Sequence, residues 1–475
     1  MSAVLPFTFC LSLRHRKDGF ERLKLLMLKN RRYIIIIILI ASVLFAAGCN
    51  NKRAGRRGGG AGAYPAAAMP AVRTLPPLPV RPLSPELQEL RVRAATAAAT
   101  TRELAWDSDV GMTELSGWEY GTRSREMAEV LGGNDLRVLS RLGIAGGMLP
   151  EGTDLATLAA SFTAVSANAT YSPLDKQVLL LTDKNRNDSL LTHEFVHALQ
   201  DQHFDLLNLL LARPYSFDRT EAMFAVVEGD AVGVQRRVDT AGAWERKSLD
   251  EIARAEDDRF VEYRQEVGRL FPPLLTETFI FRYRDGTRFV EAVRRARGER
   301  GVDDLFRRPP QSAEQILHPE KFLANAPDAQ PRDVQLDEAS FSADGWRSVA
   351  SSPLGETGVR GLLMANLSAK EAVRAAAGWG GDRAYLFERA NGSSAPLFVW
   401  KTVWDKSDEA AEFFNAYNAL KRNSEGESRD VSEDKAQVVW RTAKRSTLVR
   451  RAGDTVIIIR GADADVLAAL ENSLR

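Results

Sequence analysis

The spacing of apolar and polar positions changes sharply along the N-terminal part of the 475-residue chain. Residues 33–47 are continuously apolar, whereas residues 49–84 are rich in Gly, Ala, Pro and Arg and have no apolar period. Ser84 and Pro85 then give a helix start, and the alanines after them favour helix. The pattern predicts an apolar segment, a flexible tether that is extended in its Pro-rich half, and a folded region from residue 85.

The first part of the folded region contains patterns for loops, short helices and one strand. Two segments punctuated by glycine pairs, residues 109–133 and 134–150, are predicted to be loop-rich or to form short helices. A turn at 172–175 leads into a β-forming run at 177–182, which predicts a strand. Asp188 is placed to cap the helix that follows this strand.

The second half of the chain separates into two parts. Residues 245–300 are predicted to be mainly helical, and the aperiodic, proline-containing stretch near 325–345 is predicted to link two domains. Beyond this link, helices are expected at 368–379, 407–422 and 463–474, and strands at 383–389, 396–405, 437–443 and 446–461. The fold class is therefore α+β: a mainly helical domain with a small sheet at 85–330, followed by a smaller α+β accessory domain at 345–475.

Charge and cysteine content narrow the function classes. The chain has 64 basic and 63 acidic residues, a balance that gives no argument for a nucleic-acid partner. Cys10 and Cys49 are the only two cysteines, too few for a disulfide framework, and both are far along the chain from the histidines at 193–203.

The apolar segment has the length of a signal-peptide core. Its fifteen residues, 33–47, are too few for an ordinary membrane-crossing helix and follow the basic residues Lys29, Arg31 and Arg32. The sequence "LFAAGC" that ends at Cys49 resembles the site cleaved by the bacterial lipoprotein signal peptidase. This resemblance implies that Cys49 becomes a lipidated N-terminal residue, that residues 1–48 are an N-terminal extension and signal peptide with Met27 as the true start, and that the protein is anchored outside the cytoplasm.

Three of the five histidines lie in "HEFVHALQDQH", residues 193–203. His193 and His197 are four residues apart, so on a helix they project from one face and can share a metal ion. Glu194 falls close enough to that face to act on a water molecule at the metal, as the H-E-x-x-H pattern requires. The pattern predicts a zinc site with His193 and His197 as ligands and Glu194 as general base.

Two residues compete for the third ligand position. His203 has the spacing of the extended metzincin pattern, but Gln200 replaces the glycine that turns the chain back, so His203 is expected to be structural. Glu228 lies in the middle of the next predicted helix among apolar residues, where a carboxylate needs a partner such as zinc. We therefore predict Glu228 as the third ligand, Gly229 as a point of close approach to the histidine helix, and Asp230 as a residue that orients a ligand histidine.

These motifs resemble those of the gluzincin zinc peptidases, in particular bacterial and archaeal metallopeptidases with "HE-x-x-HALQDQHFDL" followed by "EGDA". The resemblance also includes residues 308–322, "RPPQSAEQILHPEKF", and extends over about residues 100–330. It implies a zincin-like domain in which His193, His197 and Glu228 hold zinc and Glu194 is the base. Such enzymes usually add a donor for the oxyanion, for which His318 is the first candidate and Tyr283 the second.

The predicted function is a membrane-tethered zinc metallopeptidase. Zinc lowers the pKa of a water molecule, Glu194 takes its proton, the hydroxide attacks a peptide carbonyl, and Glu194 returns the proton to the leaving amine. A non-catalytic zinc-binding lipoprotein and a structural envelope protein are the alternatives. The sequence does not indicate the peptide or protein substrate or the oligomeric state, and the accessory domain is expected to border the cleft or select substrate.

Overall fold

The computed structural model describes residues 75–158, 168–182, 186–211, 215–266, 271–389, 395–423, 432–434, 436–442 and 445–462, with Asp465 and Ala469. The predictions for the apolar segment, Met27 and Cys49 lie outside these residues, as does most of the predicted closing helix. No described helix has both the length and the apolar character needed to cross a membrane.

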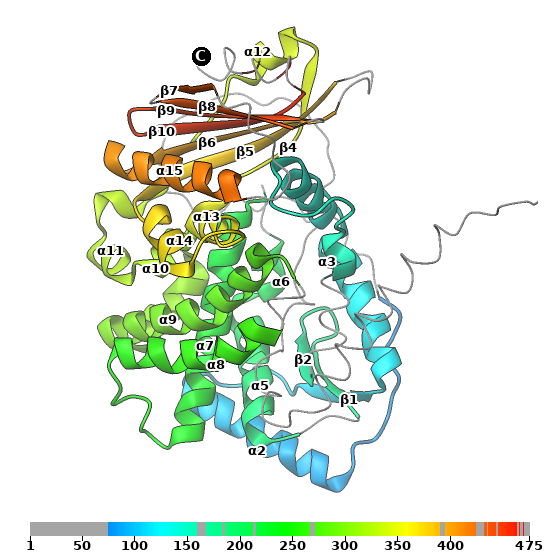
Figure 1. Cartoon of the computed structure of the whole chain (residues 1–475). Coiled ribbons are helices and arrows are strands. Elements are labelled where there is room, and N and C mark those ends of the chain that lie inside the picture. The colour runs from blue at the N-terminus through cyan, green and yellow to red at the C-terminus, as the bar shows by residue number, and fades with distance from the viewer. Residues whose placement is uncertain are drawn as a thin grey trace, which may run out of the picture.

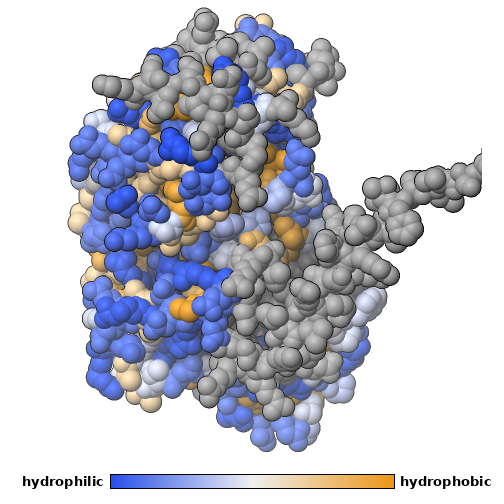
Figure 2. Space-filling model, in the orientation of Figure 1, coloured by the Kyte–Doolittle hydropathy of each residue, from blue (hydrophilic) through white to orange (hydrophobic). Residues whose placement is uncertain are grey.

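The protein has an α+β fold with a helical N-terminal region and a sheet-rich C-terminal region (Figure 1). A three-stranded sheet of order β1-β3-β2 lies beside the N-terminal helices, and a seven-stranded sheet of order β4-β5-β6-β10-β9-β8-β7 forms the C-terminal region. On the face in Figure 2, the surface is mainly hydrophilic and its hydrophobic residues lie in small, separate groups.

The N-terminal region is built from these elements: α2 (Pro85–Arg102), β1 (Gly111–Leu115), α3 (Gly117–Gly146), β2 (Ala169–Ser172), β3 (Gln177–Leu181), α5 (Asp188–Phe204), α6 (Leu206–Leu210), α7 (Phe217–Thr240), α8 (Leu249–Glu266), α9 (Pro273–Arg307), α10 (Ala313–Leu317) and α11 (Pro319–Ala324). In the small sheet, β3 pairs in parallel with β1 and antiparallel with β2. The long helices α7 and α9 pack along each other, and α5 packs against α2, α7 and β2.

The prediction for residues 109–150 was wrong. Instead of loops and short helices, this stretch forms strand β1 and one helix of 30 residues, α3, which runs through the glycine pair at 132–133. A capping box of Ser116 and Glu119 starts the helix. Leu136, Leu139 and Leu142 are buried on it, and this burial outweighs the cost of about 1 kcal/mol that a mid-helix glycine carries.

Part of the predicted tether is attached to the folded region. Residues 75–84 contain no helix or strand, in agreement with an extended Pro-rich segment. The Arg81 guanidinium pairs with Glu119 at 2.6 Å, and Arg123 donates a hydrogen bond of 2.7 Å to the Pro76 carbonyl oxygen. Leu75 and Leu78 pack against a buried apolar cluster, so a fixed point of attachment precedes α2.

The C-terminal region contains α12 (Glu338–Ala343), β4 (Trp346–Ser352), α13 (Gly355–Leu363), α14 (Ala369–Ala376), β5 (Trp379–Arg389), β6 (Leu397–Trp404), α15 (Ser407–Asn423), β7 (Ser432–Asp434), β8 (Gln437–Arg441), β9 (Ser446–Ala452) and β10 (Thr455–Gly461). The single run predicted at 446–461 forms two strands, β9 and β10, which pair antiparallel. A short 3-10 turn at Pro327–Ala329 lies in the predicted link.

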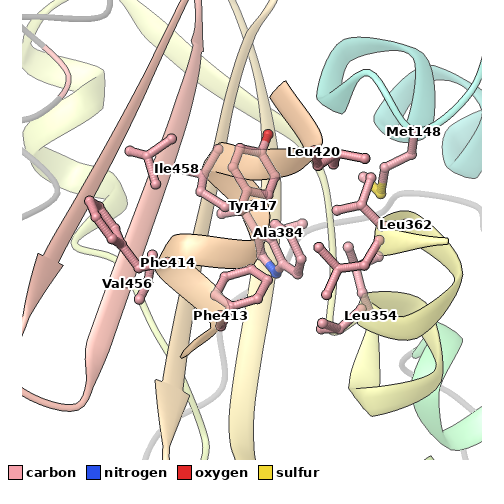
Figure 3. Packing of buried hydrophobic residues seen from close by; sticks show 14 of the residues in the cluster. Met148, Leu354, Leu362, Ala384, Phe413, Phe414, Tyr417, Leu420, Val456 and Ile458 are labelled. Atoms are coloured by element: carbon pink, nitrogen blue, oxygen red, sulfur yellow. The ribbon is translucent and has the colours of Figure 1, made fainter. Parts of the chain in front are cut away.

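The two regions share a hydrophobic core. Phe413 and Tyr417 of α15 pack between the large sheet and α13, and Met148, just after α3, points toward Leu362 of α13 (Figure 3). Helix α13 also packs against α9, α10 and α7. The C-terminal sheet is therefore joined to the helix that carries Glu228.

Candidate metal centre

Helix α5 positions both histidines of the H-E-x-x-H motif. Asn187, rather than Asp188, caps the helix by accepting a hydrogen bond of 2.8 Å from the Leu190 amide. The capping prediction was thus wrong by one residue. The Nε2 atoms of His193 and His197 lie 3.0 Å apart, and both side chains are buried.

Helix α7 brings the Glu228 carboxylate to this pair. Its Oε2 lies 3.4 Å from His193 Nε2 and 3.7 Å from His197 Nε2. The ligand atoms of a tetrahedral zinc site are about 3.3 Å apart if each lies about 2 Å from the ion. Among the described residues, these three form the one group with metal-ligand spacing, and their ligand atoms all lie within 4.8 Å of one another.

The unpaired state of Glu228 shows that the donor set fits a cation. The side chain is 0% exposed, and neither carboxylate oxygen has a hydrogen-bond partner among the described residues. Burial raises the pKa of Glu228 to about 7, against the opposing effects of His197, Arg282 and Tyr283. Because an unpartnered buried carboxylate is costly, a cation between the two imidazoles and Glu228 would remove an unfavourable arrangement.

The imidazoles are suited to bind as neutral ligands. Burial lowers the pKa of His193 to about 3 and that of His197 to about 4. At neutral pH both rings therefore have a free nitrogen lone pair, which metal binding requires. Two imidazoles and one carboxylate are a ligand set that several first-row ions accept, zinc and iron(II) among them.

Glu194 lies next to the ligand cluster. One of its oxygens accepts a hydrogen bond of 2.6 Å from the backbone amide of Tyr171 in β2, and the other is buried without a hydrogen-bond partner among the described residues. Burial raises its pKa well above the usual range, and the charge of Glu228 adds to this rise. The site thus contains one fixed and one unengaged carboxylate oxygen.

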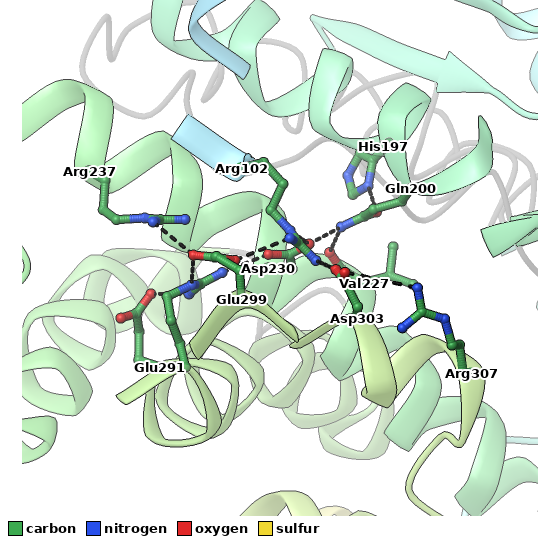
Figure 4. Close-up of polar contacts among 11 residues, drawn as sticks. Arg102, His197, Gln200, Val227, Asp230, Arg237, Glu291, Glu299, Asp303 and Arg307 are labelled. Carbon is green, nitrogen blue, oxygen red and sulfur yellow. Dashed lines mark hydrogen bonds and ion pairs between the residues drawn. The ribbon is translucent and has the colours of Figure 1, made fainter. Parts of the chain in front are cut away.

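Gln200 orients the His197 ring. Its amide nitrogen donates hydrogen bonds to Asp230 at 3.0 Å and to the Val227 carbonyl oxygen at 3.1 Å, so its oxygen faces His197 Nδ1 at 2.9 Å (Figure 4). His197 therefore carries its proton on Nδ1 and directs the lone pair of Nε2 toward His193 and Glu228. Asp230 acts on the ring through Gln200.

A buried ionic network holds Asp230 in place (Figure 4). Arg102, from α2, donates to one Asp230 oxygen at 2.9 Å, and Arg294, from α9, donates to the other at 2.7 Å. Arg102 also pairs with Glu299 and Asp303. The pKa of Asp230 is lowered because these two guanidinium groups outweigh the effect of burial, so Asp230 is a fixed anion. The network joins α2, α7 and α9 behind the ligands.

The structure separates two of the other candidate residues, His203 and His318, from the cluster. The His203 ring contacts the Ala105 carbonyl oxygen at 2.7 Å, at the far end of α5, in agreement with a structural role. His318 contacts Glu356 of α13 at 3.0 Å and Glu320 at 3.5 Å. Despite burial, Glu356 raises the pKa of His318, and His318 and Arg360 lower that of Glu356.

His318 belongs to a different part of the molecule from the metal ligands. The Ala313 amide, in the helix just before it, donates to Asp218 at the start of α7. Asp218 precedes Glu228 by ten residues, which is about 15 Å of helix at 1.5 Å per residue. The structure does not bring His318 to the cluster, and its catalytic role stays a prediction without geometric support.

Tyr283 and Gly229 both lie near Glu228, but Gly229 contacts a different helix from the one predicted. The charges of Glu228 and Glu194 both raise the pKa of Tyr283, although less than burial does, so its phenol lies near both carboxylates. Its hydroxyl is buried without a hydrogen-bond partner among the described residues. Gly229 does not face α5 as predicted: a Cβ there would lie 2.3 Å from the Gly286 backbone, so the close approach is to α9.

Sequence reasoning missed two functional neighbours. Gln200 lies three residues after His197, a spacing that on a helix brings two side chains together and could have identified it. Tyr171 contributes a backbone amide presented by a strand, and a side-chain pattern does not reveal that role. Ser216 caps α7, and Glu221 in its first turns pairs with Arg282.

The comparisons with known proteins concern mainly the C-terminal region. Residues 339–471 match a family described as a domain of unknown function (DUF8575). No curated protein and no solved structure matches the chain. The match covers the large sheet and its helices and does not include α5 or α7.

Proposed function

We propose that this protein is a zinc-dependent metallopeptidase. The observation that carries the proposal is the convergence of His193, His197 and Glu228, with the unengaged oxygen of Glu194 beside them. Two imidazoles and one carboxylate are the protein ligands of many catalytic zinc sites, where a fourth position remains for water or substrate. The zinc ion supplies a lower pKa for that water and polarises the peptide carbonyl.

The protein's own residues then handle protons and charge. Glu194 accepts a proton from the attacking water and transfers it to the leaving amine, while the Tyr171 amide keeps the carboxylate in one orientation. Tyr283 is the best-placed donor for the developing oxyanion, because its phenol lies near both Glu194 and Glu228. All four residues of the centre are at most 2% exposed, so a peptide carbonyl reaches them only when the surrounding segments open.

The same burial favours a second candidate, a non-catalytic zinc site that stabilises the fold. Structural zinc sites are closed, but they normally have four protein ligands. Here Glu194 occupies a position beside the three ligands and is hydrogen-bonded only through one oxygen. This arrangement favours the peptidase.

Metal analysis and peptide hydrolysis test the proposal. We expect one zinc ion per chain, lost in Glu228→Ala and retained in the matched control His203→Ala. Glu194→Gln should keep the zinc ion and lose hydrolysis of a protein substrate mixture. A parent protein without zinc would refute the metal site, whereas full activity in Glu194→Gln would refute the proposed base.

We also propose that the mature chain is held to a membrane through lipid on Cys49, with its folded region outside the cytoplasm. The support is the basic, apolar and small-residue pattern that ends at this cysteine. Mass spectrometry of the N-terminal peptide should find acyl groups on Cys49, and Cys49→Ser should shift the protein from the membrane fraction to the soluble fraction. An unmodified Cys49 in the parent would disprove the anchor.

A further inference from the structure

An apolar cavity lies along α7 and α9, the two helices that carry Glu228 and Tyr283. Its volume is about 90 Å³. Its walls come from α3, residues 155–158, and the facing parts of α7, α8 and α9. Leu139 of α3, Leu275 and Phe279 of α9, and Phe217 of α7 are among its apolar lining residues.

Two charged residues form a polar part of the cavity wall. Glu221 and Arg282 line it and form a buried ion pair with contacts of 2.6 and 2.7 Å. Glu221 precedes Glu228 by seven residues, which places both on one face of α7 and about 10 Å apart. Arg282 is close enough to Glu228 to lower its pKa, and the next residue, Tyr283, lies near Glu194.

We propose that this cavity is a specificity site that receives an aliphatic side chain of the polypeptide substrate, within about two residues of the scissile bond. This inference rests on the proposed peptidase function. A polypeptide advances at most about 3.6 Å per residue, so a residue next to the metal-bound carbonyl or one position further spans the distance from Glu228 to the Glu221–Arg282 pair.

The size of the cavity selects the kind of side chain. An engineered protein cavity of about 150 Å³ takes up benzene, so the smaller volume here suits a branched aliphatic side chain such as that of leucine better than an aromatic ring. The Glu221–Arg282 pair makes a charged occupant unfavourable because each charge already has its partner.

One polar group in the wall favours a peptide over an alkyl chain. Thr276 lines the cavity, and its buried hydroxyl has no hydrogen-bond partner among the described residues. A peptide residue brings backbone N–H and C=O groups with its side chain and can satisfy this hydroxyl. An acyl chain has no such group along its length.

Cleavage-site mapping tests the proposal. The full-length, zinc-loaded protein is incubated with a mixed peptide library, and the products are sequenced by mass spectrometry. We expect leucine, isoleucine or valine to exceed alanine about 10- to 100-fold at one position near the cleaved bond. Leu139→Trp and, separately, Leu275→Trp fill the cavity and should abolish that preference while peptides with alanine are still cleaved. Val92→Trp, at a position that is 52% exposed on α2, is the control and should keep the preference.

Direct binding separates this proposal from the peptidase function. Calorimetry should detect N-acetyl-leucinamide binding to the parent protein and not to Leu139→Trp or Leu275→Trp, in protein shown to be folded by its retained zinc content. If peptides are not cleaved but this binding occurs, the cavity assignment stands and the peptidase function fails. Cleavage without aliphatic preference, a preference that survives both cavity-filling variants, or tighter binding of decanoate than of N-acetyl-leucinamide would overturn the cavity proposal.

Discussion

Replacing Gln200 by leucine tests whether the protein, and not the metal alone, sets the geometry of His197. Gln200 is 0% exposed and makes three hydrogen bonds, to His197 Nδ1, to the Val227 carbonyl oxygen and to Asp230. Leucine has nearly the same volume, so Gln200→Leu removes these hydrogen bonds without leaving a large cavity. His197 can then rotate or exchange its tautomer.

The contacts indicate the size of the effect. Asp230 keeps two charged donors, Arg102 and Arg294, so the ionic network survives the substitution. The substitution removes the hydrogen bonds of the His197 Nδ1–H and of the Val227 carbonyl oxygen, so these two buried groups are left without a partner. Removing a partner that orients a metal-bound histidine typically lowers metal affinity about 10- to 100-fold, equivalent to roughly 1.4 to 2.7 kcal/mol. The unpaired groups should lower the free energy of unfolding by about 1 to 3 kcal/mol.

The assay is a zinc titration of chelator-stripped protein against a chromogenic competitor, with thermal unfolding measured on the same samples. Gln202→Leu is the matched control, because Gln202 lies on the same helix but bonds to the Asp107 amide and to Ser108 at the surface. Its zinc affinity should equal that of the parent. A zinc dissociation constant for Gln200→Leu within twofold of the parent value would refute the reasoning.

Three further outcomes are expected. Gly229→Ala should lower the free energy of unfolding by about 1 to 3 kcal/mol, because the added Cβ would lie 2.3 Å from the Gly286 backbone. Gly117→Ala is the control: a Cβ at Gly117 has no atom within 4 Å, so this variant should be more stable by up to about 1 kcal/mol. Urea titrations measure both changes. His318→Ala should lower the free energy of unfolding by about 1.5 kcal/mol between about pH 4.5 and 6.5, and by less at pH 9. The stabilisation that comes from the raised pKa of His318 is lost as pH rises, and the stabilisation that comes from the lowered pKa of Glu356 is lost as pH falls. Equal melting-point differences between the variant and the parent at pH 5.5 and at pH 9 would contradict this. Zinc at about 100 times its dissociation constant should stabilise the chelated protein by about 2.7 kcal/mol, and an unchanged melting temperature would exclude binding to the folded state.

The sequence predicted the ligand cluster better than it predicted the elements around it. His193, His197 and Glu228 could be selected because a helical repeat fixes the first two and because a carboxylate in an apolar helix needs a partner. The cluster's supporting network could not be predicted, since Arg102 and Asp230 are 128 positions apart and nothing in their local sequence indicates contact. His318 was selected as a rare residue type, and the fold places it against Glu356 of α13, so its catalytic role stays a prediction.

Secondary structure was predictable where local pattern and burial agree. The α15 helix and the β6 strand have regular apolar spacing and were recognised close to their true limits. The α3 helix was missed because a glycine pair is a strong local signal for a break, and only burial against distant residues overrides it. The order of the large sheet also depends on distant pairing, since β6 lies next to β10 with Ile457 opposite Lys401.

The ionic network behind the ligands also sets a sequence of events in synthesis. Asp230 and Gln200 leave the ribosome well before Arg294, Glu299 and Asp303, which complete the network from α9. Roughly 70 residues separate Asp230 from Asp303, and at about 5 to 20 residues per second they take roughly 4 to 14 s to emerge. During that interval only Arg102, and not Arg294, can pair with Asp230. Gln200, which orients the His197 ring, is then hydrogen-bonded to a carboxylate that is not yet fully fixed. The candidate metal centre thus matures only after α9 has emerged, although before the C-terminal sheet, and a ribosome-bound intermediate that ends before α9 should bind zinc weakly.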